Sequence, residues 1–316
     1  MKELLRRAWL GPLAALLLLY AVFSALAPDT FPGPVNLMTM ARQTVVVAIG
    51  AVGMTYVIIL GGIDLSIGSS VALTTVVVAR ALQADAPTLL ALALGLAVAV
   101  LAGVCNGALI AGLRIPPFIV TLGTMSLLRG VAKGLAGEQK IDADPRGIDA
   151  WMMPAAHGLL PLGVWLAIAA ASCAALVLRY TVFGRHVVAI GSSEQTARLC
   201  GVPVARVRLA VYALAGALAG LAGVMEFATL TVGDPTDSVG LELEVIAAVV
   251  IGGASLAGGQ GSIIGALIGA LLMTEIKTGC THVGLPNWVQ EILTGAIIVV
   301  AVAIDRLRRR QLRQAG

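Results

Sequence analysis

The chain alternates between long apolar stretches and short polar connections along its whole length. A helix needs about 20 apolar residues to cross the hydrocarbon core of a bilayer, so each stretch predicts a membrane span. The expected spans are residues 8–27, 44–60, 66–81, 88–113, 116–134, 159–178, 209–230, 244–256, 262–276 and 288–304. Strands of a membrane barrel would instead alternate over about ten residues. The pattern predicts an all-α polytopic membrane protein with about ten transmembrane helices.

The composition supports this class. With 59% hydrophobic and 12% charged residues, the 316-residue chain has too little polar surface for a water-soluble globule. Glycine contributes 37 residues and aromatic residues only 4%, a balance that favours close helix packing through small side chains. We therefore expect one transmembrane domain over residues 1–316, embedded in the lipid bilayer.

The charges predict an orientation. The formal net charge is +4, and the basic residues gather at both ends and around a loop at about residues 180–207. Loops rich in Lys and Arg stay on the cytoplasmic side, so we expect this loop and both termini in the cytoplasm. The longest polar loop, at about residues 137–158, is acidic and is then expected outside. The basic residues are not interleaved with aromatic ones, so no nucleic-acid partner is expected.

The first apolar run admits a second interpretation. It ends in Ala25-Leu26-Ala27, which resembles the cleavage site of a signal peptide. Because hydrophobic segments continue to the C-terminus, an uncleaved first span is favoured.

No residue pattern predicts a catalytic or metal site. The four cysteines lie far apart in the sequence, and the three histidines are equally isolated. The glycine-rich run at residues 249–262 lacks the Gly-x-x-x-x-Gly-Lys-Ser/Thr pattern of a P-loop. We therefore expect no enzyme active site, metal or cofactor on this chain.

One acid, Asp64, stands between two apolar runs. An ionised Asp inside a bilayer is costly unless it has partners or water. Gly61 and Gly62 can end the preceding helix, and Asp64 or Ser66 can cap the next one. Two interpretations remain open, a buried turn that Asp64 holds together and a polar path that Asp64 lines.

Two further polar residues fall inside expected spans, Asn106 and Thr121. Asn106 suits a hydrogen bond between helices or a contact with cargo. With Asp64 and Ser66 they are the candidates for either a translocation path or a structural turn.

Glycines at close spacing predict helix contacts in the last third of the chain. Gly261, Gly265 and Gly269 recur every four residues, which lets helix backbones approach. The Gly-Gly-x-x-Leu pattern that begins at Gly61 and Gly62 recurs at residues 252–256, consistent with an internal duplication. The expected packing glycines are Gly61, Gly62, Gly252, Gly253, Gly261, Gly265 and Gly269.

The basic loop contains a short expected helix. Ser192 followed three residues later by Gln195 fits a capping box, and Gly201 and Pro203 supply a stop. A helix of about two turns is too short to be stable alone. It needs either a partner surface or the bilayer surface.

Four stretches resemble the permease subunits of ribose-type sugar ABC importers: residues 61–69, 115–125, 194–201 and 249–262. The resemblance implies that the third stretch is the coupling helix, which docks into the ATPase subunit through Glu194, Gln195, Ala197, Arg198, Leu199 and Gly201. It also implies a second permease subunit, an ABC ATP-binding subunit that carries ATP and Mg, and a periplasmic sugar-binding protein. The location it implies is the bacterial inner membrane.

Two alternatives remain. An ion-coupled secondary transporter would use Asp64, Asn106 and Glu226 as coupling residues. The same ABC machinery would otherwise carry a nucleoside, an autoinducer-like sugar derivative or a branched amino acid.

Overall fold

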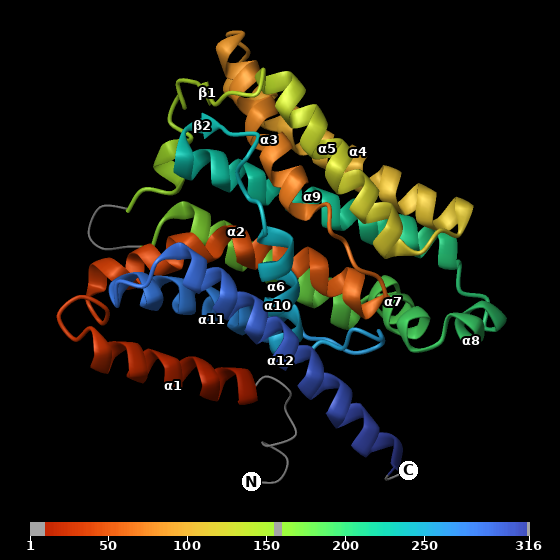
Figure 1. Cartoon of the computed structure of the whole chain (residues 1–316). Helices are drawn as coiled ribbons and strands as arrows, with labels where there is room; N and C mark the ends of the chain where they lie inside the picture. The colour runs from red at the N-terminus through yellow and green to blue at the C-terminus, as the bar shows by residue number, and fades with distance from the viewer. Residues whose placement is uncertain (1–9, 155–159, 315–316) are drawn as a thin grey trace.

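The computed structural model describes residues 10–154 and 160–314 and is almost entirely helical (Figure 1). The helices are α1 (Leu10–Leu26), α2 (Pro34–Ile59), α3 (Ile67–Gln83), α4 (Thr88–Leu113), α5 (Pro117–Ala136), η2 (Asp149–Trp151), α6 (Leu162–Tyr180), α7 (Val182–Ser192), α8 (Glu194–Leu199), α9 (Val204–Leu230), α10 (Leu241–Ile251), α11 (Ile263–His282) and α12 (Asn287–Gln314). Two short strands, β1 (Ile141–Asp142) and β2 (Val232–Gly233), complete the described part of the chain.

Six described helices are long and apolar enough to cross a membrane, namely α2, α4, α5, α6, α9 and α11. Three shorter apolar helical segments join them, α1, α3 and the first part of α12. The long helices run between two ends of the molecule (Figure 1). We call the end with β1 and β2 the strand end, and the end with α7 and α8 the α8 end.

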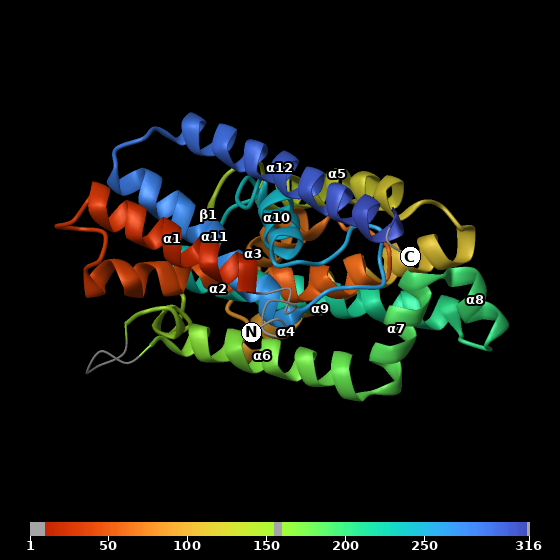
Figure 2. The ribbon, with the colours of Figure 1, turned by 90° about the horizontal axis from the view of Figure 1, so that it is seen from below.

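Helix α2 forms the centre of the bundle. Every residue from Thr44 to Ile59 is buried, so this part of the helix is enclosed on all sides. Figure 2 shows it running between α6 on one side and α10 and α12 on the other. A helix that is apolar all round belongs inside a membrane protein, because lipid would leave its small residues without packing partners.

Helix α9 crosses α4 in close backbone contact. At the crossing, a Cβ on Gly103 would lie 3.0 Å from the Cα of Gly216, and a Cβ on Gly216 would lie 3.0 Å from the Cα of Gly103. Helix association in a membrane depends on such close van der Waals packing, because lipid supplies no hydrophobic driving force. These glycines therefore determine how near α4 and α9 approach.

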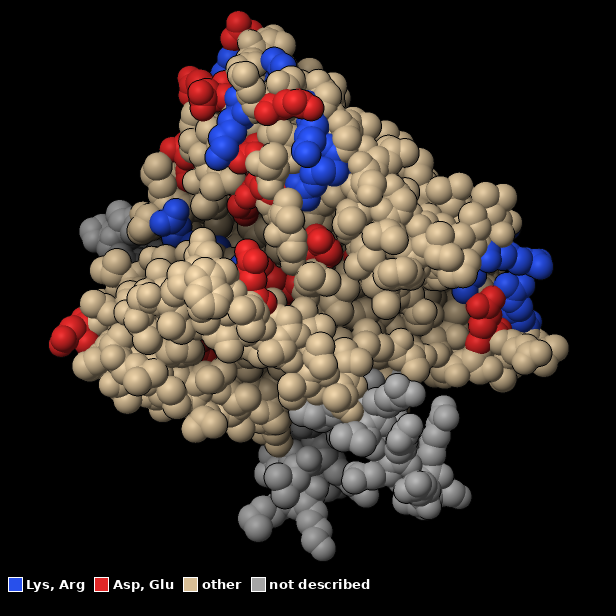
Figure 3. Space-filling view, in the orientation of Figure 1, with Lys and Arg blue, Asp and Glu red and all other residues tan. Residues whose placement is uncertain are grey.

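Charged side chains concentrate at the two ends of the bundle. Figure 3 shows Lys, Arg, Asp and Glu gathered at the strand end and at the α8 end, with few charges between them apart from acidic side chains near the middle of this face. The sparsely charged region between the two ends matches the apolar interior of a bilayer.

The strands were not expected in an all-α fold. Ile141 pairs with Gly233 and Asp142 with Val232 in an antiparallel ladder that ties together the loops after α5 and α9. Lys140 adds an ion pair to Asp234, with 3.0 Å between Nζ and Oδ2. The pairing joins residues about 90 positions apart, so no local pattern predicts it.

Several expected helix boundaries are wrong. Helix α2 begins at Pro34 and not near Thr44, because proline suits the first turn of a helix and the polar Arg42 and Gln43 continue that helix. Helix α9 begins at Val204, five residues before the expected span, and α11 continues to His282 beyond the expected end at residue 276. The loop expected at residues 137–158 extends in part beyond the described residues, since positions 155–159 are not described.

Candidate functional site

The basic loop contains two helices where the sequence predicts one. In α7, the hydroxyl oxygen of Thr181 accepts a hydrogen bond from the Gly184 N–H at 3.2 Å and caps the helix. Val187 and Ile190 are buried against the bundle. This apolar face explains why an 11-residue helix forms inside a basic connection.

Helix α7 covers the end of α2. A Cβ on Gly191 would overlap the carbonyl oxygen of Ile59, so only glycine fits there. The same carbonyl oxygen accepts a hydrogen bond from the N–H of Gly259 at 2.8 Å. The α8 end is thus a junction of α2, α7 and the loop between α10 and α11.

The expected cap of α8 is off by one residue. Ser192 is the last residue of α7, where its hydroxyl donates to the carbonyl oxygen of Val188 at 2.9 Å. Ser193 is the N-cap, and its Oγ accepts from the N–H of Thr196 at 3.3 Å. Ser192 is occupied by α7, a helix that the sequence does not predict, so the capping role passes to Ser193.

The carboxylate of Glu194 joins α8 to α9. Its Oε1 accepts from Arg198 on the same helix, with Nη2 at 2.6 Å, and its Oε2 accepts from Arg208 of α9, with Nη2 at 2.7 Å. The Arg198 hydrogen bond, together with Arg208, outweighs the effect of partial burial and lowers the pKa of the Glu194 carboxyl. Arg208 was not predicted to take part, because its partner is fourteen positions away.

We expect Glu194→Gln to loosen α8 by no more than about 1 kcal/mol, since these ion pairs are partly exposed. Because the folded pKa is lowered, the ion pairs stabilise α8 above the ordinary pKa of a Glu and are lost only as the pH falls through the lowered value. Amide exchange of α8, corrected for its intrinsic pH dependence, should therefore stay constant from about pH 8 to pH 5. Gln195→Ala, an exposed change on the same helix, is the control. Equal protection in Glu194→Gln and wild type would show that these ion pairs do not hold α8.

One face of α8 turns away from the protein. Ala197 is buried, whereas Gln195 and Arg198 are exposed and Leu199 is 88% exposed. Gly201 follows with φ of +80°, and the N–H of Val202 donates to the carbonyl oxygen of Ala197 at 3.0 Å. This is a Schellman turn, which needs a residue with left-handed backbone angles at the position of Gly201.

Asp64 holds the turn between α2 and α3. It is 2% exposed, and its Oδ1 accepts from the Ser66 N–H at 2.8 Å and from the Ser66 hydroxyl at 2.6 Å. Neither Asp64 nor Ser66 caps α3 through a free N–H of its first turn, contrary to expectation. Ser66 has helical backbone angles, and its hydroxyl donates back to Asp64.

Two other helices are attached to this turn. Asn106 of α4 donates from Nδ2 to the Ser66 hydroxyl at 2.9 Å, and Thr121 of α5 donates to the carbonyl oxygen of Ile63 at 3.1 Å. The four candidate residues, which span 57 positions of sequence, therefore meet at one buried turn. Their hydrogen bonds connect α3, α4 and α5 at the α8 end.

Tyr212 of α9 is a member of this site that the sequence did not predict. A Cβ on Gly62 would lie 2.5 Å from its hydroxyl oxygen. Tyr212 is fully buried, and neither its hydroxyl nor the Oδ1 of Asn106 has a hydrogen-bond partner among the described residues. A tyrosine within the apolar stretch between Arg208 and Glu226 of α9 was the available signal.

The candidate glycines serve two purposes. Gly61 and Gly253 have φ of +89° and +91° and end α2 and α10 in Schellman turns. The two turns are offset by one residue: the turn glycine is the first of the pair Gly61-Gly62 but the second of the pair Gly252-Gly253.

Gly252, Gly265 and Gly269 instead let α10 and α11 touch. A Cβ on Gly265 would overlap the carbonyl oxygen of Gly252, and a Cβ on Gly269 would overlap the carbonyl oxygen of Ala248. A Cβ on Gly261 would lie 2.7 Å from Ile59.

The groups invoked for ion coupling do not gather at one place. Glu226 follows Tyr212 by fourteen residues on α9, which corresponds to about 21 Å of helix. Asp64 and Asn106 lie near Tyr212, so Glu226 is remote from them. Among the described side chains, no three His, Cys, Asp or Glu residues are arranged to hold a metal ion.

Comparison with known proteins assigns the family. Residues 36–302 match the family described as the branched-chain amino acid transport system permease component. The ribose import permease protein RbsC of Escherichia coli K12 is 38% identical over 309 residues, 96% of each chain. The L-arabinose ABC transporter permease protein AraH of Azospirillum brasilense is 36% identical, over 96% of this chain and 89% of its own. The autoinducer 2 import system permease protein LsrC of Klebsiella pneumoniae is 36% identical, over 98% of this chain and 90% of its own.

No solved structure matches the chain. The resemblance to sugar importer permeases, inferred from four short stretches, is confirmed by these nearly full-length matches. With its apolar helices, the chain is a multi-pass membrane protein that belongs to the family of branched-chain amino acid transport system permease components.

Proposed function

We propose that this chain is the membrane-spanning permease subunit of an ATP-driven ABC importer that moves a sugar of the pentose or hexose class. The observation that carries the proposal is the match over 96% of both chains to a protein named as a ribose import permease. The family description names branched-chain amino acids, but the full-length relatives named above are called ribose, arabinose and autoinducer 2 permeases. A sugar is therefore the favoured cargo.

The subunit is a transport component and not an enzyme. We propose that ATP and Mg bind to a separate ATPase subunit, which docks on α8 at its exposed Leu199. Close by, a shallow cavity of about 670 Å³ is bordered by Arg114, Arg198 and Arg206. These arginines suit acidic side chains on that partner. A second permease subunit and a periplasmic sugar-binding protein complete the proposed machine.

We further propose that the whole chain is one transmembrane domain in the bacterial inner membrane, with about ten crossings and both termini in the cytoplasm. The basic residues near α7 and α8 support a cytoplasmic α8 end, and the acidic loop before η2 supports an outer strand end. The Asp64 turn then lies at the cytoplasmic side, where it serves as a structural turn more readily than as a path.

Reconstitution tests the function. The chain, its ATPase and its binding protein are placed in proteoliposomes, and uptake of labelled ribose and arabinose is measured with and without ATP. Uptake that requires both ATP and the binding protein is expected. Uptake without ATP that collapses when a proton or sodium gradient is dissipated would identify a secondary transporter instead.

Cysteine labelling tests the orientation. In a background without native cysteines, an impermeant thiol reagent added to intact cells should label Gln139→Cys, in the exposed loop before β1. It should label Arg198→Cys on α8 only after the membrane is opened. Labelling of position 198 in intact cells would overturn the orientation.

A further inference from the structure

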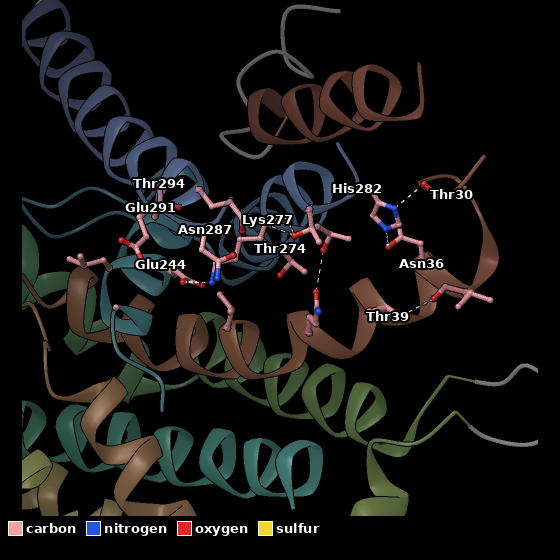
Figure 4. A pocket seen from close by; sticks show the side chains of 18 of the residues that line it. Thr30, Asn36, Thr39, Glu244, Thr274, Lys277, His282, Asn287, Glu291 and Thr294 are labelled. Carbon is pink, nitrogen blue, oxygen red and sulfur yellow. Dashed lines mark hydrogen bonds and ion pairs between the residues drawn. The ribbon is translucent and has the colours of Figure 1, made fainter. Parts of the chain in front are cut away.

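A cavity of about 1180 Å³, lined by polar as well as apolar side chains, opens at the strand end, between α2, α10, α11 and α12 (Figure 4). None of the four candidate path residues lines it, since Asp64, Ser66, Asn106 and Thr121 surround the turn at the α8 end. No role for the residues that line the cavity was predicted from the sequence. The chemistry of the cavity is therefore not explained by any site described above.

Two helices turn a polar stripe toward the cavity. On α11 the stripe consists of Thr274, Lys277, Thr278 and Thr281, and on α12 it consists of Asn287, Gln290, Glu291 and Thr294. Both stripes have the spacing i, i+3, i+4, i+7, which places four side chains on one face of a helix. The two faces meet where Gln290 donates from Nε2 to the Thr281 hydroxyl at 3.3 Å.

The face of α11 opposite the polar stripe is apolar. Its other face carries Leu272, Ile276 and Cys280, which pack with apolar residues of α1. Polar side chains at membrane depth are expensive, and they persist where they face a water-filled cavity or one another. With the exception of the buried Glu275, the hydrophilic residues from Thr274 to His282 line the cavity, which indicates a hydrated compartment.

The charged lining residues comprise one ion pair and two further acids, Asp29 and Glu291. Lys277 forms an ion pair with Glu244 of α10, and the Thr278 hydroxyl donates to the Gln43 amide oxygen of α2 at 3.1 Å. These contacts link three of the four walls. The remaining hydroxyl and amide groups, with the carboxylates of Asp29 and Glu291 as acceptors, match a ligand with many hydroxyls, such as a sugar.

The lining suits weak, transient binding of a passing sugar better than tight binding. No Phe, Tyr or Trp occurs among the described lining residues, although tight pockets usually provide aromatic surface. The volume also exceeds the usual range of about 300–1,000 Å³ for small-molecule pockets. A monosaccharide would enter with part of its water and be held weakly.

The cavity does not continue through the bundle. Its lining ends at Val47, Thr274 and Ile298. Closer to the α8 end, Gly265 and Gly269 bring α11 into backbone contact with α10. The compartment is thus open at the strand end and closed below by the glycine contact between α10 and α11.

We propose that this cavity is the outer compartment of the sugar path, and that the polar stripes of α11 and α12 bind the sugar hydroxyls as it enters. The inference rests on the proposed function. It specifies a place and a ligand chemistry that differ from those of the Asp64 turn.

Gly295 is a suitable position for testing the cavity by cysteine labelling, because it lines the cavity and a Cβ there would meet no atom within 4 Å. Gly295→Cys, in a chain whose native cysteines are replaced, should transport normally after reconstitution with the ATPase and binding protein. A bulky, impermeant thiol reagent added from the strand-end side should then reduce uptake at least tenfold. Assembly precedes the modification, so a loss of uptake does not reflect failed folding.

Gln139→Cys is the matched control, since it lies at the same end but outside the cavity. Its modification should leave uptake unchanged. Full uptake by labelled Gly295→Cys, or failure of that position to react, would overturn the cavity inference. Absence of ATP-driven uptake in the unmodified cysteine-free complex, or failure of Gln139→Cys to react, would instead contradict the proposed function or orientation.

A second measurement tests the ligand chemistry. Thr274→Val and Thr294→Val remove one hydroxyl from each stripe at nearly constant volume, and together they should lower the uptake rate about three- to tenfold. Sugar affinity of the binding protein should not change. Thr229→Val is the control, because that hydroxyl donates to the Met225 carbonyl oxygen of its own helix. Uptake by the double variant equal to that of the control would refute sugar contact by the stripes.

Discussion

Leu199→Asp on α8 is expected to abolish sugar uptake while leaving the membrane bundle folded. Leu199 is 88% exposed in the isolated chain, so its replacement removes no internal packing. Burying a leucine against a partner contributes about 1.5–3 kcal/mol, and a charge in its place reverses that gain. Binding of the ATPase should weaken at least about tenfold, measured by co-purification and by sugar-stimulated ATP hydrolysis.

Gly201→Val should give the same defect for a different reason. A β-branched residue at φ of +80° is strained, so the turn that ends α8 would rearrange and displace its exposed face. Gly201→Asn is the matched control, because asparagine tolerates left-handed angles. The control should retain most of the uptake.

Both variants should still bind the sugar-loaded binding protein, since α8 and the strand end are far apart in the bundle (Figure 1). Full uptake with the ATPase still bound would mean that α8 is only a surface helix. The proposed coupling role would then rest on similarity alone.

Asp64→Leu is expected to damage assembly of the complex more than its affinity for cargo. The substitution removes the acceptor of both the N–H and the hydroxyl of Ser66, and it also disturbs the bond from Asn106. Leaving such buried groups unpaired costs about 2–4 kcal/mol in total. The yield of folded complex after detergent extraction and the uptake should therefore fall together.

Asp64→Asn separates the two interpretations of this residue. The amide keeps an oxygen acceptor of the same shape, so the turn should form and the complex should assemble close to the wild-type yield. Uptake per assembled complex should be preserved as well. Normal assembly of Asp64→Leu with abolished uptake would show that Asp64 lines the path.

Helix boundaries were predictable where lipid covers the helix. Residues 88–113 are expected and observed as one helix, because most of α4 faces outward and its hydropathy alone marks both ends. The start of α2 was missed because Gln43 faces an internal cavity, so a polar residue does not mark the end of a helix there. Helix α7 was missed because its apolar face is covered by distant segments.

The sequence by itself determined the features that depend on solvent and on near neighbours. Hydropathy specified a helical membrane protein, and Gly61 and Gly201 marked helix ends that have positive φ, since both effects act within a few residues. Only the tertiary structure decided which distant side chains meet. Asp64 and Thr121 share a turn, and the stripes of α11 and α12 enclose a cavity, because helix packing sets the rotation of each helix about its axis. That rotation depends on contacts along the whole bundle, which no local pattern contains.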